Sequence, residues 1–289
     1  MKKFLDSEII VQDAACTSFT SMVLINKEKL EPYLFDIFKI ITSVFNSYTG
    51  TSLLTLYEII SLLAENFEDH FKNIELIGGL VGCVVKRWYD MVKSEDLKNI
   101  CPVFEILCAI IKSSGERLAE YFNHFFAGSI WILESNYKIY KQNNYDENFL
   151  DKELLSKSID MISILCQQFP TKVRNHQNKN KILDCVFKYL QTNNNFLKHY
   201  LIALIGDLSR ADNTLLKNQF HSVMIIVINN MEIPDNTKLE SFEMERMSVC
   251  NNSCWTAGIL ALSYPFEIDD YVADIMRKIL KILSLPKVI

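Results

Sequence analysis

The sequence predicts an all-α protein built from helices that stack in pairs. The first sign is a scarcity of turn residues: the 289-residue chain has only 8 glycines and 6 prolines, too few for the tight turns of an all-β protein. The second is apolar periodicity, as in Leu34, Ile37 and Ile41, which lines one face of a helix. The third is an acidic residue embedded in every second helix, which recurs after roughly 43 to 55 residues.

Apolar stripes predict the helices in order along the chain. We expect them at 8–25, 29–47, 52–66, 73–92, 99–113, 118–142, 151–168, 180–191, 195–209, 217–231, 245–262 and 267–283. The longer polar breaks fall at 141–149, 171–180 and 232–242. A longer helix with a bulky outer face is followed by a second helix with smaller residues and an embedded acid, namely Asp13, Glu58, Glu105, Asp160 or Asp207.

This spacing is typical of HEAT or armadillo arrays, whose helix pairs recur every 40–47 residues or so. We therefore expect residues 1–289 to form a single right-handed superhelical solenoid of about six HEAT-like repeats, without an internal domain boundary. The chain begins at a second helix and ends just after one, without polar caps, so we expect a fragment of a longer solenoid.

Composition narrows the function classes. The chain is 49% hydrophobic with a net charge of -5, so it can bury about three-quarters of its unfolded surface and lacks the clustered lysine and arginine of a nucleic-acid footprint. Its apolar runs are too short to span a membrane, and no signal peptide is visible. The eight cysteines sit mostly in apolar runs, as in reduced intracellular proteins. We expect neither nucleic acid nor membrane as a partner.

The second helices should line the concave side of the solenoid with a row of carboxylates that ends beside a tryptophan. Neighbouring helices pack 8–10 Å apart and an extended peptide rises about 3.3 Å per residue, so helices would meet the peptide at about every third residue. A basic, partly hydrophobic peptide matches this surface. The alternative is that each acid is simply a solvated surface group.

Several segments resemble the transportin family of karyopherin-beta receptors, which bind PY-type nuclear localisation signals. The resemblance covers nearly the whole chain and matches the C-terminal half of the family. The segments are Val11-Gln12-Asp13-Ala14-Ala15-Cys16, Leu53-Leu54-Thr55-Leu56-Tyr57-Glu58, Arg87-Trp88, Leu204-Ile205-Gly206-Asp207-Leu208 and, most specifically, Ser248-Val249-Cys250-Asn251-Asn252-Ser253-Cys254-Trp255.

The resemblance implies a nuclear import receptor that shuttles between cytoplasm and nucleus. Its partners would be cargo proteins with PY-type signals, with nucleoporins and the Ran GTPase expected for the full-length receptor, whose Ran-binding N-terminal arch is absent here. The central signal site would be lined by Asp13, Ala14, Ser21, Glu58, Glu65 and Glu105, and Asp160 and Asp207 would continue its acidic surface. The upstream hydrophobic or basic epitope of the signal would bind at Met247, Asn251 and Trp255.

The chain also departs from the family. Leu24 and Gln167 stand where the family has acids, and Cys101 where it has an aromatic, so cargo preference should differ. The family tryptophan that packs against the Pro-Tyr pair would lie before Met1. The stretch 232–245 is longer than the family's connection, and we assign it no function.

Other interpretations remain beside this one. Periodicity alone would place Trp255 in the core, and only the resemblance moves it to the surface; Trp88 and Trp131 are assigned to packing. Cys250 and Cys254 lack the second pair that zinc requires, so we expect no metal. Without catalytic or phosphate-binding motifs we expect neither an enzyme nor a cofactor. The alternative function is a HEAT-repeat scaffold or adaptor that binds another protein partner.

Overall fold

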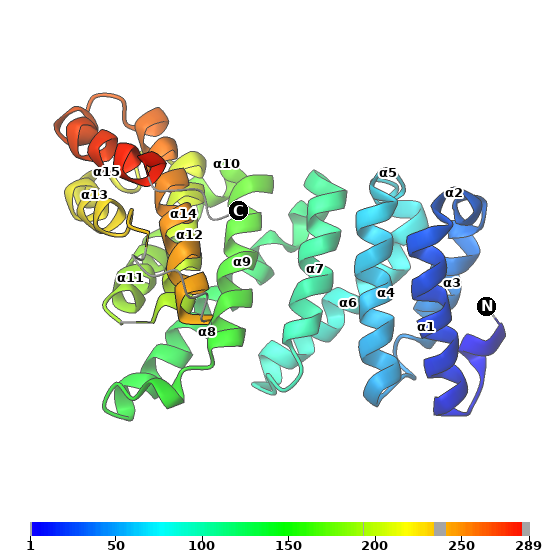
Figure 1. Cartoon of the computed structure of the whole chain (residues 1–289). Coiled ribbons are helices and arrows are strands. Elements are labelled where there is room, and N and C mark those ends of the chain that lie inside the picture. The colour runs from blue at the N-terminus through cyan, green and yellow to red at the C-terminus, as the bar shows by residue number, and fades with distance from the viewer. Residues whose placement is uncertain (1, 193, 234–240, 285–289) are drawn as a thin grey trace. The chain divides into compact units, whose positions relative to one another are not determined.

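Helices make up most of the computed structural model, which describes residues 2–192, 194–233 and 241–284 and contains no strand within those ranges (Figure 1). The longer helices are α1 (Ile9–Ile25), α3 (Leu34–Val44), α4 (Gly50–Asn66), α6 (Ile74–Ser94), α7 (Cys101–Ser114), α8 (Phe122–Gln142), α9 (Lys152–Gln168), α11 (Lys179–Leu190), α12 (Asn195–Ala211), α13 (Phe220–Asn229), α14 (Ser241–Ser263) and α15 (Val272–Ser284). Between them lie α2 (Lys27–Leu30), α5 (Glu68–Phe71), α10 (Pro170–Asn175) and the 3-10 turns η1 (Lys2–Leu5), η2 (Glu31–Tyr33), η3 (Gly115–Tyr121), η4 (Glu147–Phe149), η5 (Lys217–Gln219) and η6 (Asp269–Tyr271).

Each helix expected from the sequence is confirmed, with differences at the ends. The expected helix 29–47 is divided into α2, η2 and α3, and the segment before α8 is the 3-10 turn η3. The expected break at 171–180 was wrong in part, since α10 occupies its first half. Pro170 stands at the first position of α10, where a missing N–H removes no helical hydrogen bond.

Polar side chains fix several helix starts. The side-chain oxygens of Asn73, Asp151 and Asn194 accept backbone N–H bonds at 3.1, 3.0 and 3.1 Å in the first turns of α6, α9 and α12. Such caps satisfy N–H groups that have no partner inside the helix. Two of these helices, α9 and α12, are second helices of a pair, so the caps fix the residues at which these two helices begin.

The chain divides into two compact units, which are described separately. In the first, Met1–His124, the second helices α1, α4 and α7 pack side by side, and α3 packs on α6 behind them (Figure 1). Leu56, Ile60 and Phe104 are fully buried in its core. The hydroxyl of Ser113 on α7 donates to the carbonyl of Ala64 on α4 at 2.8 Å, which joins neighbouring repeats inside the core.

The second unit, Phe125–Ile289, repeats this arrangement. Its second helices α9, α12 and α14 pack in sequence, with α11 against α12 and α13 against α14. Ile202 and Leu208 are fully buried, and the hydroxyl of buried Tyr189 on α11 donates to the carbonyl of Leu133 on α8 at 2.9 Å. Both units are therefore layers of paired helices. The expectation of one uninterrupted array over 1–289 stays a prediction.

Other expectations concern cysteines, tryptophans and apolar segments. All eight cysteines are free thiols, and Trp88 is buried against Phe104 while Trp131 is half-buried. In the part of the chain that the structure describes, no single helix is long and apolar enough to cross a bilayer, although Ile9–Ile25 and Lys27–Val44 pass that test together as a pair bent by 116°. Much of the stretch 232–245 lies outside the described residues.

Candidate functional site

The second helices of the first unit carry a row of exposed acids. Glu58 and Glu65 lie on α4 and Glu105 on the neighbouring α7, and all three are exposed. Because Glu58 and Glu65 are seven residues apart, their side chains share one helix face. Neither accepts a hydrogen bond or ion pair from any residue in the described ranges, so both carboxylates are open to a ligand. We call Glu58, Glu65 and Glu105 the acidic row.

Asp13 has a different environment from the acidic row. It is half-buried on α1, and its carboxylate accepts hydrogen bonds from Ser52 and, at 2.9 Å, from Thr51, both at the start of α4. The carboxylate thus joins two neighbouring second helices and has less capacity for a ligand. Ala14 is exposed beside it, and the exposed Ser21 hydroxyl donates to a carbonyl of its own helix at 3.2 Å.

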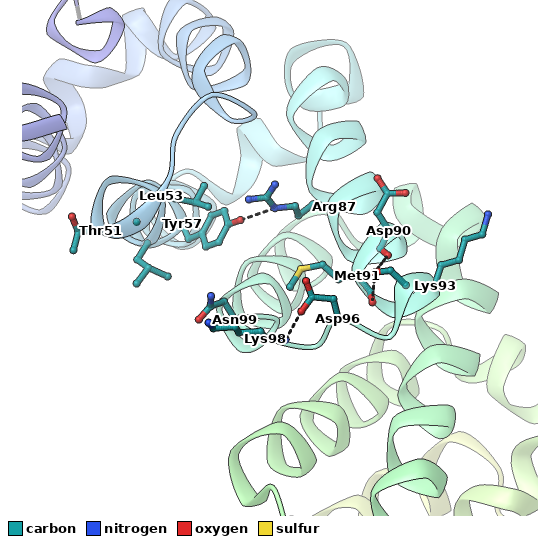
Figure 2. A pocket seen from close by; sticks show the side chains of 13 residues that line it. Thr51, Leu53, Tyr57, Arg87, Asp90, Met91, Lys93, Asp96, Lys98 and Asn99 are labelled. Carbon is teal, nitrogen blue, oxygen red and sulfur yellow. Dashed lines mark hydrogen bonds between the residues drawn. The ribbon is translucent and has the colours of Figure 1, made fainter. Parts of the chain in front are cut away.

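A pocket of about 1020 Å³ opens next to this junction, lined by the start of α4, the end of α6 and the loop before α7 (Figure 2). The Arg87 Nε donates to the Tyr57 hydroxyl at 3.2 Å, and Thr51 contributes to the wall. Burial raises the pKa of Tyr57, and the Arg87 guanidinium opposes that rise. Sequence reasoning did not assign these residues to a site, although the polar helix start Gly50-Thr51-Ser52 follows Asp13 by one repeat.

In the second unit, Asp207 corrects one expectation. Helical spacing placed it on the exposed acidic surface beside Asp160, but it is only 4% exposed, whereas Asp160 is half-buried. The reason is that α12 lies between α9 and α14, so that its polar stripe is covered from both sides. The Gln167 amide of α9 donates to both Asp207 oxygens, at 3.1 and 3.2 Å.

Burial also affects the protonation equilibrium of Asp207. Burial raises the pKa of Asp207, and the hydrogen bonds from Gln167 and Ser163 together with the charge of Arg210 hold the pKa rise in check. An acid in place of Gln167 would set two carboxylates against each other here, whereas the amide can donate. Gln167 therefore accommodates the buried charge of Asp207.

Helix α14 is fixed on α12 by two side chains that point inward. The Asn252 amide donates to the carbonyl of His199, and the Thr256 hydroxyl donates to the carbonyl of Ile202, both at 2.8 Å. Asn252 and Thr256 are one helical turn apart, so the two bonds together fix the rotation and the register of α14. Asn252 belongs to a segment that resembles the transportin family, but the sequence did not predict this positioning role.

This register places the Trp255 ring across α12. A Cβ at Gly206 would lie only 2.4 Å from Cζ3 of the ring, so the close contact requires glycine at that position. The ring is nevertheless 37% exposed, and the Arg210 guanidinium carbon lies over it, 5.1 Å from its centroid. The core position that periodicity alone favoured for Trp255 is therefore wrong.

Met247 and Asn251 precede Trp255 by two turns and one turn, and both are exposed. Both residues line two neighbouring pockets. The first pocket, of about 460 Å³, is also lined by His199, whose pKa is lowered by burial. The second, of about 440 Å³, is also lined by Cys250 and Cys254. The Cys250 thiol donates to Cys254, which lowers the pKa of Cys254 and raises that of Cys250. Within the described ranges, no three histidine, cysteine or acidic side chains cluster as metal ligands would.

Comparison with known proteins gives one consistent result. No protein-family profile matches the chain. It is 24% identical to transportin-1 of Homo sapiens over 289 residues, which is 99% of this chain and 31% of the relative. It is 25% identical to transportin of Dictyostelium discoideum over 285 residues, or 97% and 29%. The chain is similar to transportins over nearly its whole length.

The fold of this transportin-like chain agrees with that result. The solved structure of yeast importin-beta superposes with a TM-score of 0.65 over 97% of this chain and 32% of that chain, at 13% identity. The expected HEAT-repeat fold is confirmed. The chain spans about a third of the length of the relatives it matches. At the positions that depart from the family, Leu24 is 61% exposed on α1 and Cys101 is half-buried at the start of α7.

Proposed function

We propose that this chain is the cargo-binding part of a nuclear import receptor. It binds basic, PY-type nuclear localisation signals of cargo proteins on its second helices, for transport through the nuclear pore between cytoplasm and nucleus. The central observation is the acidic row, because Glu58 and Glu65 are exposed and have no partner within the described residues. Nucleoporins and Ran are partners proposed for the whole receptor, and the chain carries out no catalysis.

The acidic row suits an extended basic peptide for physical reasons. Helices that pack 8–10 Å apart meet a strand with a rise of about 3.3 Å per residue at about every third position. Carboxylates at those points attract lysine and arginine without requiring one fixed sequence, which is what a receptor for many cargoes needs. The exposed ring of Trp255 in the second unit supplies an anchor for the upstream epitope.

The test is a titration with a fluorescent peptide that carries a basic segment followed by Pro-Tyr. The double variant Glu58→Gln with Glu65→Gln should weaken binding between about two- and thirtyfold, since exposed charge pairs contribute about 0.2–1 kcal/mol each. The matched control is Glu75→Gln with Glu116→Gln, which removes the same charge from exposed positions on α6 and η3. If both double variants lost the same affinity for the peptide, the effect would come from net charge alone and not from the acidic row.

A second peptide, with Pro-Tyr changed to Ala-Ala, separates signal recognition from general attraction. The proposed function expects it to bind more weakly than the parent peptide. If the chain bound neither peptide while remaining folded, the HEAT scaffold or adaptor with another protein partner would replace the proposal.

A further inference from the structure

We propose that the Arg210 guanidinium covers one face of the Trp255 ring and thereby makes this site select a hydrophobic epitope over a basic one. The inference rests on the proposed function and deepens it, because it names the class of side chain that the upstream site accepts. It uses residues of the second unit only. Three features carry it: the position of the ring, the position of the guanidinium and the burial of the Asp207 carboxylate.

The ring and the guanidinium are held together by α12. Gly206 and Arg210 are one helical turn apart and lie on the same face of that helix. The six-membered part of the Trp255 ring rests on Gly206, and the exposed Arg210 reaches over the ring with its guanidinium carbon 5.1 Å from the centroid. This is the position that a lysine or arginine of a bound peptide would need for a cation–π contact.

The acid that interacts with Arg210, Asp207, is not available to pair with an arriving cation. Asp207 is buried, and both of its oxygens accept hydrogen bonds from the Gln167 amide. The charge of Arg210 acts on this carboxylate, as the lowering effect of Arg210 on the pKa of Asp207 shows. A cation that approached Trp255 from solvent would therefore meet the exposed positive charge of Arg210 first.

A hydrophobic side chain meets no such obstacle. Met247, Asn251 and Trp255 are spaced four apart on α14 and thus line one face of it, and all three are exposed. An aliphatic or aromatic residue can pack against Met247 and the open part of the ring while Arg210 stays in place. A basic residue must displace Arg210 or bind close to a like charge, and either event weakens its binding.

The experiment compares two synthetic peptides that share one basic Pro-Tyr segment and differ only upstream, with Leu-Met in one and Lys-Arg in the other. The wild-type chain should bind the Leu-Met peptide more tightly. Arg210→Gln should strengthen binding of the Lys-Arg peptide by about two- to fivefold, the range of an exposed cation–π contact, and should leave binding of the other nearly unchanged.

Two further variants separate charge at the ring from other effects. Arg210→Lys keeps the charge and should keep the preference for the hydrophobic peptide. Lys217→Gln removes an equal charge from an exposed position in η5 and should leave the ratio of the two affinities unchanged. Thermal unfolding of each variant checks that the fold is intact.

The possible failures are distinct. If the wild-type chain binds both peptides but Arg210→Gln leaves their affinity ratio unchanged, the inference on Arg210 is overturned and the proposed function stands. A wild-type preference for the Lys-Arg peptide would also overturn it. If the folded wild-type chain binds neither peptide, both the inference and the proposed function fail.

Discussion

A single glycine decides where the most exposed aromatic of the candidate site lies. The Trp255 ring rests on Gly206, and any Cβ there would overlap with it. Glycine inside a helix costs about 1 kcal/mol relative to alanine, so its presence in α12 needs a compensating benefit. That benefit is the close approach, because the ring gains packing on one side and stays 37% exposed on the other.

This contact gives a prediction for stability. Gly206→Ala should destabilise the chain by about 1–3 kcal/mol through overpacking. In a Trp255→Ala background the same substitution should be neutral or slightly stabilising, because the overlap is gone and alanine favours the helix. Urea unfolding of the four proteins in this cycle measures the coupling.

The control for that cycle is Gly258→Ala. Gly258 lies in the interior of α14 and a Cβ there would have no neighbour within 4 Å, so this change should stabilise by up to about 1 kcal/mol. Equal effects of Gly206→Ala with and without Trp255 would contradict the contact as described.

At the scale of elements, the junction of α9 and α12 depends on a buried charge. Asp207 joins these helices through Gln167, and burial raises its pKa above the ordinary value of 3.8. A folded-state pKa above the unfolded one means that the folded state holds the proton more tightly. The contribution of Asp207 to stability is therefore greatest in acid and is lost as the pH rises through the raised pKa.

Replacement of this carboxylate should show that linkage. Asp207→Asn should melt at a higher temperature than the wild type near neutral pH, since the amide carries no charge into the buried site. The difference should shrink as the pH falls through the raised pKa, where the wild-type carboxyl becomes neutral too. Melting curves from about pH 8 to about pH 4 measure it.

The exposed Glu65→Gln serves as the matched control, because its side chain is not buried on folding. The melting temperatures of Glu65→Gln and wild type should differ little at any pH in the series. A gap between Asp207→Asn and wild type that widened on acidification would have the wrong sign and would exclude burial as the main influence on Asp207.

Helix positions could be predicted from the sequence because amphipathic stripes encode them directly. Periodicity places a residue on a face of its own helix but does not reveal what packs over that face. Asp207 shares the polar stripe of α12 with His199, yet α9 and α14 cover it, and only the tertiary arrangement shows this. The glycine before it was a usable signal, since a glycine within a helix often marks a close approach.

Short elements were missed for a related reason. The helix α10 has too few residues to show an apolar period. Pro170 is also a residue type that usually ends helices, although here it stands at the helix start. The exposure of Glu58 and Glu65 could be predicted from spacing, because in the part of the chain that the structure describes no element covers these two side chains on α4. Whether they bind cargo is a separate matter that stays a prediction.

At the scale of the whole molecule, charge sets how binding responds to salt. The chain has a net charge of -5, and the carboxylates of its acidic row face solvent. Raising the salt from about 0.1 M to about 1 M shortens the Debye length from about 10 Å to about 3 Å. Affinity for a basic Pro-Tyr peptide should then fall by about tenfold.

Calorimetry at several salt concentrations measures this response. A peptide that keeps Pro-Tyr and the hydrophobic residues but has its lysines and arginines replaced by glutamine is the control, and its affinity should vary little. Salt-independent, full-strength binding of the basic peptide would contradict the role given to the acidic row.

The two inward bonds of α14 also bear on how this surface could diversify. Asn252 and Thr256 donate to main-chain carbonyls of α12, and every residue type presents that acceptor. The seating of α14 is thus insensitive to which side chains α12 carries on its outer face, Arg210 included. A substitution at that position can alter which ligands are accepted while the tryptophan keeps its place, so recognition can drift by single steps without loss of the scaffold.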